Sequence, residues 1–405
     1  MNETSLSTAV AASGPLDLVP RMKGQGYEPQ DVERRRAWLE AKPGTALPHI
    51  SAYCIPSDAM RGNIENPIGT AQMPLGVAGP LVVRGAHADG VFYVPLATTE
   101  GALVRSYERG MVTLSRAGGA QTRIYVDENR ISPVFFFRDV GAAHDFVDQM
   151  RQQVETIREI AGSTTRHGAL LRLEYHPIGR EVIVNFCYHT ADAQGMNMIA
   201  KATDQACAWI MAHSQAQRYY IFSGYSTEKR ASGALFAGGK GKKVTAGAQV
   251  PAAVVRAYLH TTPARLVDMW HHTLLGHVQA NAMGYNGHYA NGLTAIFIAC
   301  GQDVANVANA CVGLTNFELT DEGDLYASVT LPALTVATVG GGTGLGTSRE
   351  CLEMLGCAGS GHAAKFAEIV AASLLAGELS MGAAVASSEF VNAHETYGRN
   401  RPNHD

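Results

Sequence analysis

The chain has 405 residues, of which 46% are hydrophobic and 17% charged, and its formal net charge at pH 7 is −4. This balance is typical of a globular protein of two or three domains and excludes a disordered chain. The small net charge argues against nucleic acid as a partner. The sequence contains no uninterrupted apolar run of about 18 residues, so we expect no membrane-spanning helix.

Three further sequence features bear on the cellular compartment of the protein and on metal binding. Seven cysteines form no C-x-x-C pair, and their odd number and apolar surroundings predict reduced, buried thiols in a cytoplasmic protein. The first residues carry no basic segment ahead of their small-residue run, so we expect no secretory signal. The 15 histidines show no H-E-x-x-H or comparable spacing, which argues against a metal site.

The first quarter of the chain alternates between regular and irregular segments. Residues 29–41 predict a helix that ends at a Lys-Pro-Gly break. Residues 65–81, ENPIGTAQMPLGVAGPL, are rich in glycine and proline and indicate a shaped loop or an extended surface strand, either lining a site or acting as a linker. An apolar run over residues 91–96 follows.

A helix is predicted directly after the sequence ATTEG at residues 97–101. Apolar side chains then recur on one helical face, at Leu103, Tyr107, Met111 and Leu114. Thr98 or Thr99 is expected to cap this helix, which places Glu100 in its first turn. A carboxylate there is favoured by the helix dipole, so Glu100 is either a dipole-compensating surface residue or a functional acid.

The next hundred residues predict a separate small domain. Its elements follow the order β-α-β-β-α-β, the split pattern of ferredoxin-like domains. The expected strands are 133–137, 169–175, 181–189 and 218–222, and the expected helices are 140–160 and 195–212. We therefore expect an α+β protein in which residues 124–222 are inserted into a large mixed helical and sheet domain, with the ends near Arg123 and Ser223 close together.

The rest of the chain belongs to the large domain, which comprises residues 49–123 and 223–405, and residues 1–48 form a tail and a helical segment. Helices are predicted at 251–259, 263–280, 293–300 and 364–391, and a strand meander at 313–339. The glycines at 340–346 have the spacing G-G-G-x-G-x-G rather than G-x-G-x-x-G, which argues against a Rossmann phosphate loop. They indicate a close backbone approach instead. The basic cluster GGKGKK at 238–243 indicates a solvated loop or a local anion contact.

Four polar residues are candidates for chemistry, each with a structural alternative. Lys229 lies at the predicted domain junction and is either part of a surface charge cluster or an oxyanion donor. Asp303 follows a buried helix, where the dipole disfavours an acid by several tenths of a kcal/mol. His394 follows the last apolar helix, as a cap or as a catalytic group. Arg166, beside three hydroxyl residues, suits a phosphate or is a plain loop arginine.

These segments resemble motifs of the hydroxymethylglutaryl-CoA reductase family, in order from residue 65 to 399. The matching segments are ENPIGTAQMPLGVAGPL, VPLATTEG, DAQGMNM, STEKR, GYNGHYAN, TAIFIACGQD, TVGGGTGLGTSRECLEMLG and LLAGELSMGAAVAS. The chain is most similar to the class I version without a membrane anchor. The resemblance implies reduction of HMG-CoA by two NADPH to mevalonate and CoA, through a thiohemiacetal and mevaldehyde, with no metal or flavin. It also implies a homo-oligomer with active sites at the dimer interface.

Roles follow from the resemblance, position by position. Lys229 would stabilise the thioester carbonyl oxygen, Glu100 would protonate the aldehyde oxygen, Asp303 would hold this pair, and His394 would protonate the CoA thiolate. We therefore expect Glu100 to be buried near Asp303 and Lys229. Arg123 and Arg230 would grip the substrate carboxylate, within a shell of Ser223, His288 and Asn291. The implied cofactor residues are Thr165, Arg166, His167, Asp192, Gln194, Gly195, Met196 and Asn197.

The chain departs from the family motifs at the rim of this site. Gln194 replaces a methionine, Glu228 an aspartate and Arg230 a lysine, the SGYSTEK loop is one residue shorter, and Ala393 replaces a serine. These changes leave two alternatives open, a reductase of a related acyl-CoA and a catalytically silent CoA- or nucleotide-binding homologue. The intact set of Glu100, Lys229, Asp303 and His394 argues against the silent homologue.

Overall fold

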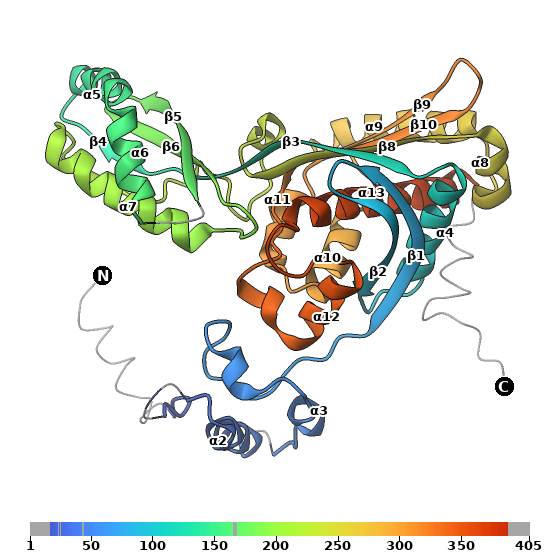
Figure 1. Ribbon diagram of the computed structural model, residues 1–405, viewed down its shortest axis with the longest axis horizontal. Helices are drawn as coiled ribbons and strands as arrows, with labels where there is room; N and C mark the ends of the chain where they lie inside the picture. The colour runs from blue at the N-terminus through green and yellow to red at the C-terminus, as the bar shows by residue number, and fades with distance from the viewer. Residues whose placement is uncertain (1–16, 23, 25, 43, 165–167, 388–405) are drawn as a thin grey trace, which may run out of the picture. The chain divides into compact units, whose positions relative to one another are not determined.

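The computed structural model describes residues 17–22, 24, 26–42, 44–164 and 168–387 (Figure 1). The chain divides into two compact units between Met73 and Pro74. In the first unit, helix α2 (Pro29–Glu40) confirms the predicted helix and is followed by α3 (Pro48–Ser51) and the short 3-10 helix η1 (Ser57–Met60). The buried guanidinium of Arg35 donates to two backbone carbonyls and ties α2 to the surrounding loops.

The second unit is built on a large, mainly antiparallel sheet with the strand order β2-β1-β3-β8-β10-β9. Its strands are β1 (Leu75–Gly85), β2 (Asp89–Ala97), β3 (Ala120–Ile131), β8 (Gly241–Val250), β9 (Leu314–Leu319) and β10 (Leu325–Leu334). Strand β1 pairs in parallel with β3, and the other pairs of this sheet are antiparallel. The second half of the glycine- and proline-rich segment 65–81 therefore lies in β1 and forms an extended strand.

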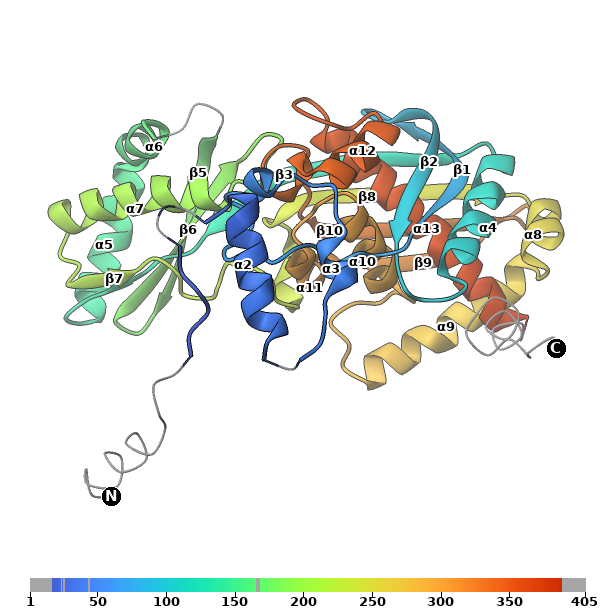
Figure 2. The ribbon, with the colours of Figure 1, turned by 90° about the horizontal axis from the view of Figure 1, so that it is seen from below.

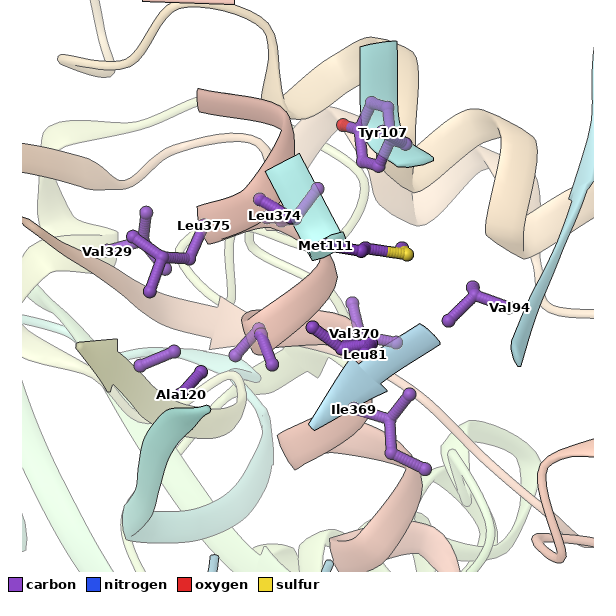
Figure 3. Close-up of a cluster of buried hydrophobic side chains, with 14 of the residues drawn as sticks. Leu81, Val94, Tyr107, Met111, Ala120, Val329, Ile369, Val370, Leu374 and Leu375 are labelled. Atoms are coloured by element: carbon purple, nitrogen blue, oxygen red, sulfur yellow. The ribbon is translucent and has the colours of Figure 1, made fainter. Parts of the chain in front are cut away.

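Helix α13 (Ala363–Ala386) runs through the main core of the second unit. It contacts α4 (Leu103–Arg116), α9 (Pro263–Gln279), α10 (Tyr289–Ala299) and strands β8 and β10. Figure 3 shows its side chains Ile369, Val370, Leu374 and Leu375 among side chains of β1, β2 and α4. The helix is long and apolar enough to span a membrane, but 83% of its most apolar window is buried inside the protein. Burial on all sides explains why its sequence shows no polar face.

A second sheet lies within residues 129–220 (Figure 2). It has its own hydrophobic core. Its strands have the order β7-β4-β6-β5 and are antiparallel throughout. The elements are β4 (Val134–Phe136), α5 (Val140–Gln152), α6 (Val154–Gly162), β5 (Ala169–Ile178), β6 (Glu181–His189), α7 (Met196–His213) and β7 (Arg218–Tyr220). The single helix predicted over 140–160 is two helices, because the backbone leaves helical geometry at Gln153.

The two sheets share one strand. Residues 120–128 of β3 pair with β1 and β8 in the large sheet, and Asn129, Arg130 and Ile131 pair with β6 in the small one. A register shift between Ile124 and Val126 marks the approach to the junction. The chain therefore passes from one sheet to the other without an intervening loop, and the residues near this junction are candidates for a site.

The remaining elements complete the large part of the second unit. They are η2 (Gly233–Ala237), α8 (Ala252–Leu259), η3 (Val304–Asn306), α11 (Val307–Ala310), η4 (Gly341–Gly344) and α12 (Gly346–Met354). Helix α10 begins four residues before the predicted position, where the Asn286 side chain accepts a hydrogen bond from the Tyr289 amide at 3.1 Å. Residues 335–339, predicted as the last strand of the meander, lie outside any strand.

Candidate active site

Lys229 and Asp303 form an ion pair, which is the contact that the family resemblance implies. Lys229 Nζ lies 2.7 Å from Asp303 Oδ2, with 44% and 35% of the two side chains exposed. Lys229 has a φ of +53°, a strained backbone conformation of the kind that clusters at functional sites. Asp303 does not lie at the negative end of a helix, because α10 ends at Ala299. It caps η3 instead, accepting from the Ala305 amide at 3.1 Å.

The loop that carries Lys229, residues 223–230, is held from both sides of the sheet junction. Ser223 Oγ donates to the Ser132 carbonyl at 2.7 Å. The Tyr225 ring packs on His176 of β5, with 4.4 Å between ring centroids. Glu228 forms an ion pair with Lys240, directly before β8. These contacts fix the position of the ammonium group beside the shared strand.

Two buried basic residues next to this loop, Lys240 and Arg130, were not predicted as site residues from the sequence. Lys240 is fully buried, and its Nζ donates to Asn129 Oδ1 at 2.7 Å. Burial, and secondarily the charge of Arg130, lowers the pKa of Lys240 to about 7. Arg130 is 6% exposed, and within the described part of the chain its Nε and Nη2 have no hydrogen-bond partner. The basic cluster 238–243 is therefore not solvated at Lys240. The density of basic residues in this cluster was the sequence feature that could have indicated a functional lysine.

Glu100 differs from expectation in its exposure and in its hydrogen-bond partner. It is exposed rather than buried, and its Oε2 accepts a hydrogen bond of 2.8 Å from Asn291 Nδ2. Helix α4 begins at Leu103 after an uncapped Ala102, so the predicted threonine cap and the place of Glu100 in the first turn are wrong. Thr98 Oγ1 accepts from the Glu100 amide at 3.0 Å and so stabilises a turn ahead of the helix.

His288 and Asn291 lie around the start of α10 and accompany Glu100, as expected for a shared site. The His288 ring stacks on the Tyr107 ring with 5.6 Å between centroids. Glu378 of α13 accepts hydrogen bonds from the amides of Gly287 and His288. Burial first, and then the charges of Glu378 and Glu100, raise the pKa of Tyr107 well above its usual value. In the described part of one chain, no hydrogen bond or ion pair joins Glu100 to Lys229 or Asp303.

The two arginines expected at the substrate carboxylate are both exposed. Arg123 Nη1 donates to the carbonyls of Thr122 at 2.6 Å and Arg84 at 3.3 Å, on the large sheet. Arg230 follows Lys229 and faces solvent. Arg130 is better suited to an anion, because two nitrogens of its buried guanidinium have no hydrogen-bond partner among the described residues and such unsatisfied donors are costly.

The implied cofactor residues divide into three groups. Thr165, Arg166 and His167 lie outside the described residues, as does His394. The Asp192 carboxylate accepts from the Gly361 and Ala363 amides at the start of α13, at 2.7 and 3.0 Å. Burial opposes ionisation there, but these donors lower the pKa of Asp192.

The third group surrounds the start of α7. Gly195, with a φ of +73°, precedes a helix whose first turn lacks a side-chain cap. A Cβ on Gly195 would lie 2.8 Å from Thr190, so the position requires glycine. Asn197 is exposed in that turn, and Met196 Sδ lies 3.4 Å from Lys240 Nζ. Gln194 Nε2 donates to Glu228 Oε1 at 3.3 Å.

The described residues contain no group of three or more His, Cys, Asp or Glu side chains placed to hold a metal ion. The seven cysteines are free thiols, but their expected burial holds for only part of the set. Cys54 is exposed and Cys311 is partly exposed, whereas the other five are buried.

Comparisons with known proteins cover almost the whole chain. The family model described as hydroxymethylglutaryl-coenzyme A reductase matches residues 31–399. The 3-hydroxy-3-methylglutaryl-coenzyme A reductase of Methanothermobacter thermautotrophicus is 43% identical over 373 residues, which cover 91% of this chain and 93% of that protein. The enzyme of the same name from Methanocaldococcus jannaschii is 43% identical over 378 residues, with the same coverage of both chains.

A solved structure supports the fold. The class II 3-hydroxy-3-methylglutaryl-CoA reductase from Streptococcus pneumoniae, bound to NADPH in open conformations, has a TM-score of 0.66 and 19% sequence identity, covering 87% of this chain and 96% of that one. At this identity the likeness shows the mixed α/β fold alone. The expected class I character is not confirmed, because the names of the archaeal relatives give no class and this structure is of a class II enzyme.

Proposed function

We infer the function of this chain from its family: it belongs to the hydroxymethylglutaryl-coenzyme A reductases. It is an oxidoreductase that reduces HMG-CoA with two NADPH to mevalonate and CoA, in the mevalonate pathway. The observation that carries this inference is the 43% identity over 91% of the chain to reductases of that name. Purified protein should oxidise about two NADPH per CoA released from HMG-CoA, and no oxidation with either nicotinamide would refute the function.

Lys229 is the group that we assign to the carbonyl oxygen. Hydride addition, which NADPH supplies when bound, places negative charge on that oxygen, and a positioned ammonium stabilises it. Asp303 holds the ammonium at 2.7 Å, and the partial exposure of Lys229 leaves it accessible to a ligand. Glu100 supplies the proton to the aldehyde oxygen, and His394 protonates the departing thiolate.

Arg130 is our candidate for the substrate carboxylate, in place of Arg123. The support is its burial next to the Lys229 loop with two nitrogens lacking partners among the described residues, because a carboxylate accepts hydrogen bonds from a guanidinium in a fork. Arg130→Met should raise KM for HMG-CoA at least tenfold and leave KM for NADPH within about twofold. Arg123→Met is the matched control, and a larger effect there would reverse the assignment.

In this proposal residues 124–222 form the small nicotinamide-cofactor domain, inserted into a large domain that comprises residues 74–123 and 223–387 of the second unit. The strand order β7-β4-β6-β5 with intervening helices supports a ferredoxin-like, non-Rossmann topology. The N-terminus of α7, which has no side-chain cap, suits a pyrophosphate, because the helix dipole favours an anion there. Thr165, Arg166 and His167 are the proposed site of the 2′-phosphate.

A second copy of the chain completes the site. The support is that the catalytic groups have partners at opposite ends of α10: Glu100 accepts from Asn291 in its first turn, whereas Lys229 pairs with Asp303, which follows its last turn. Mixing Glu100→Gln protein with Lys229→Met protein tests this, because a mixed dimer holds one intact site. Recovery of about a quarter of the wild-type rate is expected for random exchange of subunits. Mixtures that exchange subunits and stay inactive would refute a shared site.

A related acyl-CoA is the second candidate substrate. Gln194 and Glu228, two positions that depart from the family motifs, are hydrogen-bonded to each other beside the Lys229 loop. Such a coupled change alters the rim of the pocket, so the NADPH assay should include a panel of acyl-CoA esters. Higher kcat/KM with another ester would favour this candidate.

We place the enzyme in the cytoplasm, which the burial of the apolar helix α13 supports.

A further inference from the structure

Glu378 is a buried carboxylate that binds the turn in front of α10. Its side chain is 2% exposed, its Oε1 accepts from the His288 amide at 2.8 Å, and its Oε2 accepts from the Gly287 amide at 2.7 Å. Thr315 Oγ1 of β9 also donates to Oε2, at 2.7 Å. Three donors from two segments thus meet one charge, which makes these bonds shorter and stronger than neutral ones.

The turn held by Glu378 leads directly to the Glu100 contact. His288 is the residue before α10, and Asn291 in the first helical turn donates to Glu100 Oε2 at 2.8 Å. The orientation of that first turn therefore decides where the Asn291 amide, and with it the Glu100 carboxylate, is held.

The His288 ring is fixed by the same group of residues. It lies between the Tyr107 ring, on which it stacks, and Glu378, whose Oε1 is 3.5 Å from His288 Nδ1. Close packing leaves no free space here. A Cβ on Gly377 would lie 2.5 Å from the Tyr107 ring and 2.9 Å from His288, and a Cβ on Gly292 would lie 1.9 Å from the Tyr107 hydroxyl. A shift of the turn is thus transmitted to the histidine.

We propose that Glu378 is a positioning residue for the reduction, acting through the turn at 287–288 to hold His288, Asn291 and Glu100 in one arrangement. The proposal rests on the proposed function of Glu100 and gives α13 a role beyond filling the core. Loss of such positioning costs about tenfold to a hundredfold in rate when reacting groups move by about 1 Å.

The same helix carries a matched control. Glu368, ten residues before Glu378, is also fully buried and accepts from three backbone amides, at Ala86, His87 and Ala88. These lie in the turn between β1 and β2, and among the described residues no hydrogen bond or ion pair joins Glu368 to Glu100, His288 or Asn291. A purely structural effect of losing a buried carboxylate should therefore be alike in both variants.

Glu378→Gln keeps the length of the side chain but leaves one of the two amides facing an NH₂ group. We expect kcat with HMG-CoA to fall tenfold or more, while KM for NADPH stays within twofold. Glu368→Gln should lose a similar amount of thermal stability and keep kcat within twofold. Thr315→Val, which removes a single donor, should lower kcat severalfold and keeps the test available if Glu378→Gln does not fold.

A double-mutant cycle separates positioning from general damage. If Glu378 acts through the turn, its substitution should matter less once Asn291 is gone. The kcat of the double variant Glu378→Gln, Asn291→Ala should then be no more than about threefold below that of Asn291→Ala alone. Independent, multiplicative effects on kcat would overturn the proposal, as would an equal loss of kcat in Glu368→Gln. Wild-type protein without reductase activity would instead refute the proposed function itself, so the two failures are distinguishable.

Discussion

Gly110→Ala should strongly destabilise the protein, although alanine is the better helix former. Gly110 lies inside α4 and faces α13, and a Cβ at this position would lie 1.9 Å from the Ala376 carbonyl oxygen and 2.5 Å from the Ala376 carbonyl carbon. Ordinary contact begins at 3.4 Å, so the two backbones would have to separate by about 1.5 Å. Both atoms belong to the backbone of a buried helix, which has no rotamer with which to move aside.

The expected loss follows from two opposing terms. Replacing a helical glycine with alanine stabilises by about 1 kcal/mol, whereas overpacking of a close-packed core costs about 3 kcal/mol or more. We therefore expect the free energy of unfolding to fall by at least about 2 kcal/mol, measured by equilibrium urea unfolding. Gly276→Ala is the control, because Gly276 lies exposed in α9 and a Cβ at this position would have nothing within 4 Å. That variant should gain about 0.5–1 kcal/mol. Equal gains in both variants would refute the close helix contact.

Three further predictions concern single side chains. Tyr107→Phe should change the free energy of unfolding by less than about 1 kcal/mol, because its buried hydroxyl has no hydrogen-bond partner among the described residues. Tyr289→Phe removes the hydrogen bond that its hydroxyl donates to the Leu314 carbonyl and should cost about 1–2 kcal/mol in the same urea assay. The lowered pKa of Lys240 means that the unfolded chain binds more protons between pH 7 and 10.5, so stability should rise with pH there. Urea unfolding at several pH values should show a smaller rise in Lys240→Met and an unchanged one in Lys243→Met. Arg166→Ala should raise KM for NADPH far more than KM for NADH, and equal changes would discredit the 2′-phosphate role.

Local patterns predicted the elements well where each residue's environment follows from its neighbours in sequence. The spacing of Tyr107, Met111 and Leu114 predicts a buried face of α4, and all three side chains are fully buried. The order of strands and helices in the small sheet follows for the same reason. The glycines and prolines of 65–81 left a loop and an extended strand open, and the second half of the segment forms β1. Gly79 and Pro80 fit into this strand because they lie at the register shift between Ala78 and Leu81.

The candidate site was predictable in part. The ion pair of Lys229 with Asp303 was expected, since matching motifs imply it. Arg130 and Lys240 were missed because burial of a cation depends on segments distant in sequence, here the junction of β3 with the Lys229 loop. Glu100 was misplaced for a related reason. Its burial was expected from contacts with Lys229 and Asp303, but in the described part of one chain its carboxylate is hydrogen-bonded to Asn291 instead.

The place of α13 in the chain has a consequence for biosynthesis. Every element that packs against it, from β1 to β10, precedes it in sequence and therefore leaves the ribosome first. Until α13 has been synthesised, the apolar side chains that it covers in the folded protein stay exposed on the nascent chain, where they favour aggregation. Folding of the large domain can therefore be completed only after α13 has been synthesised.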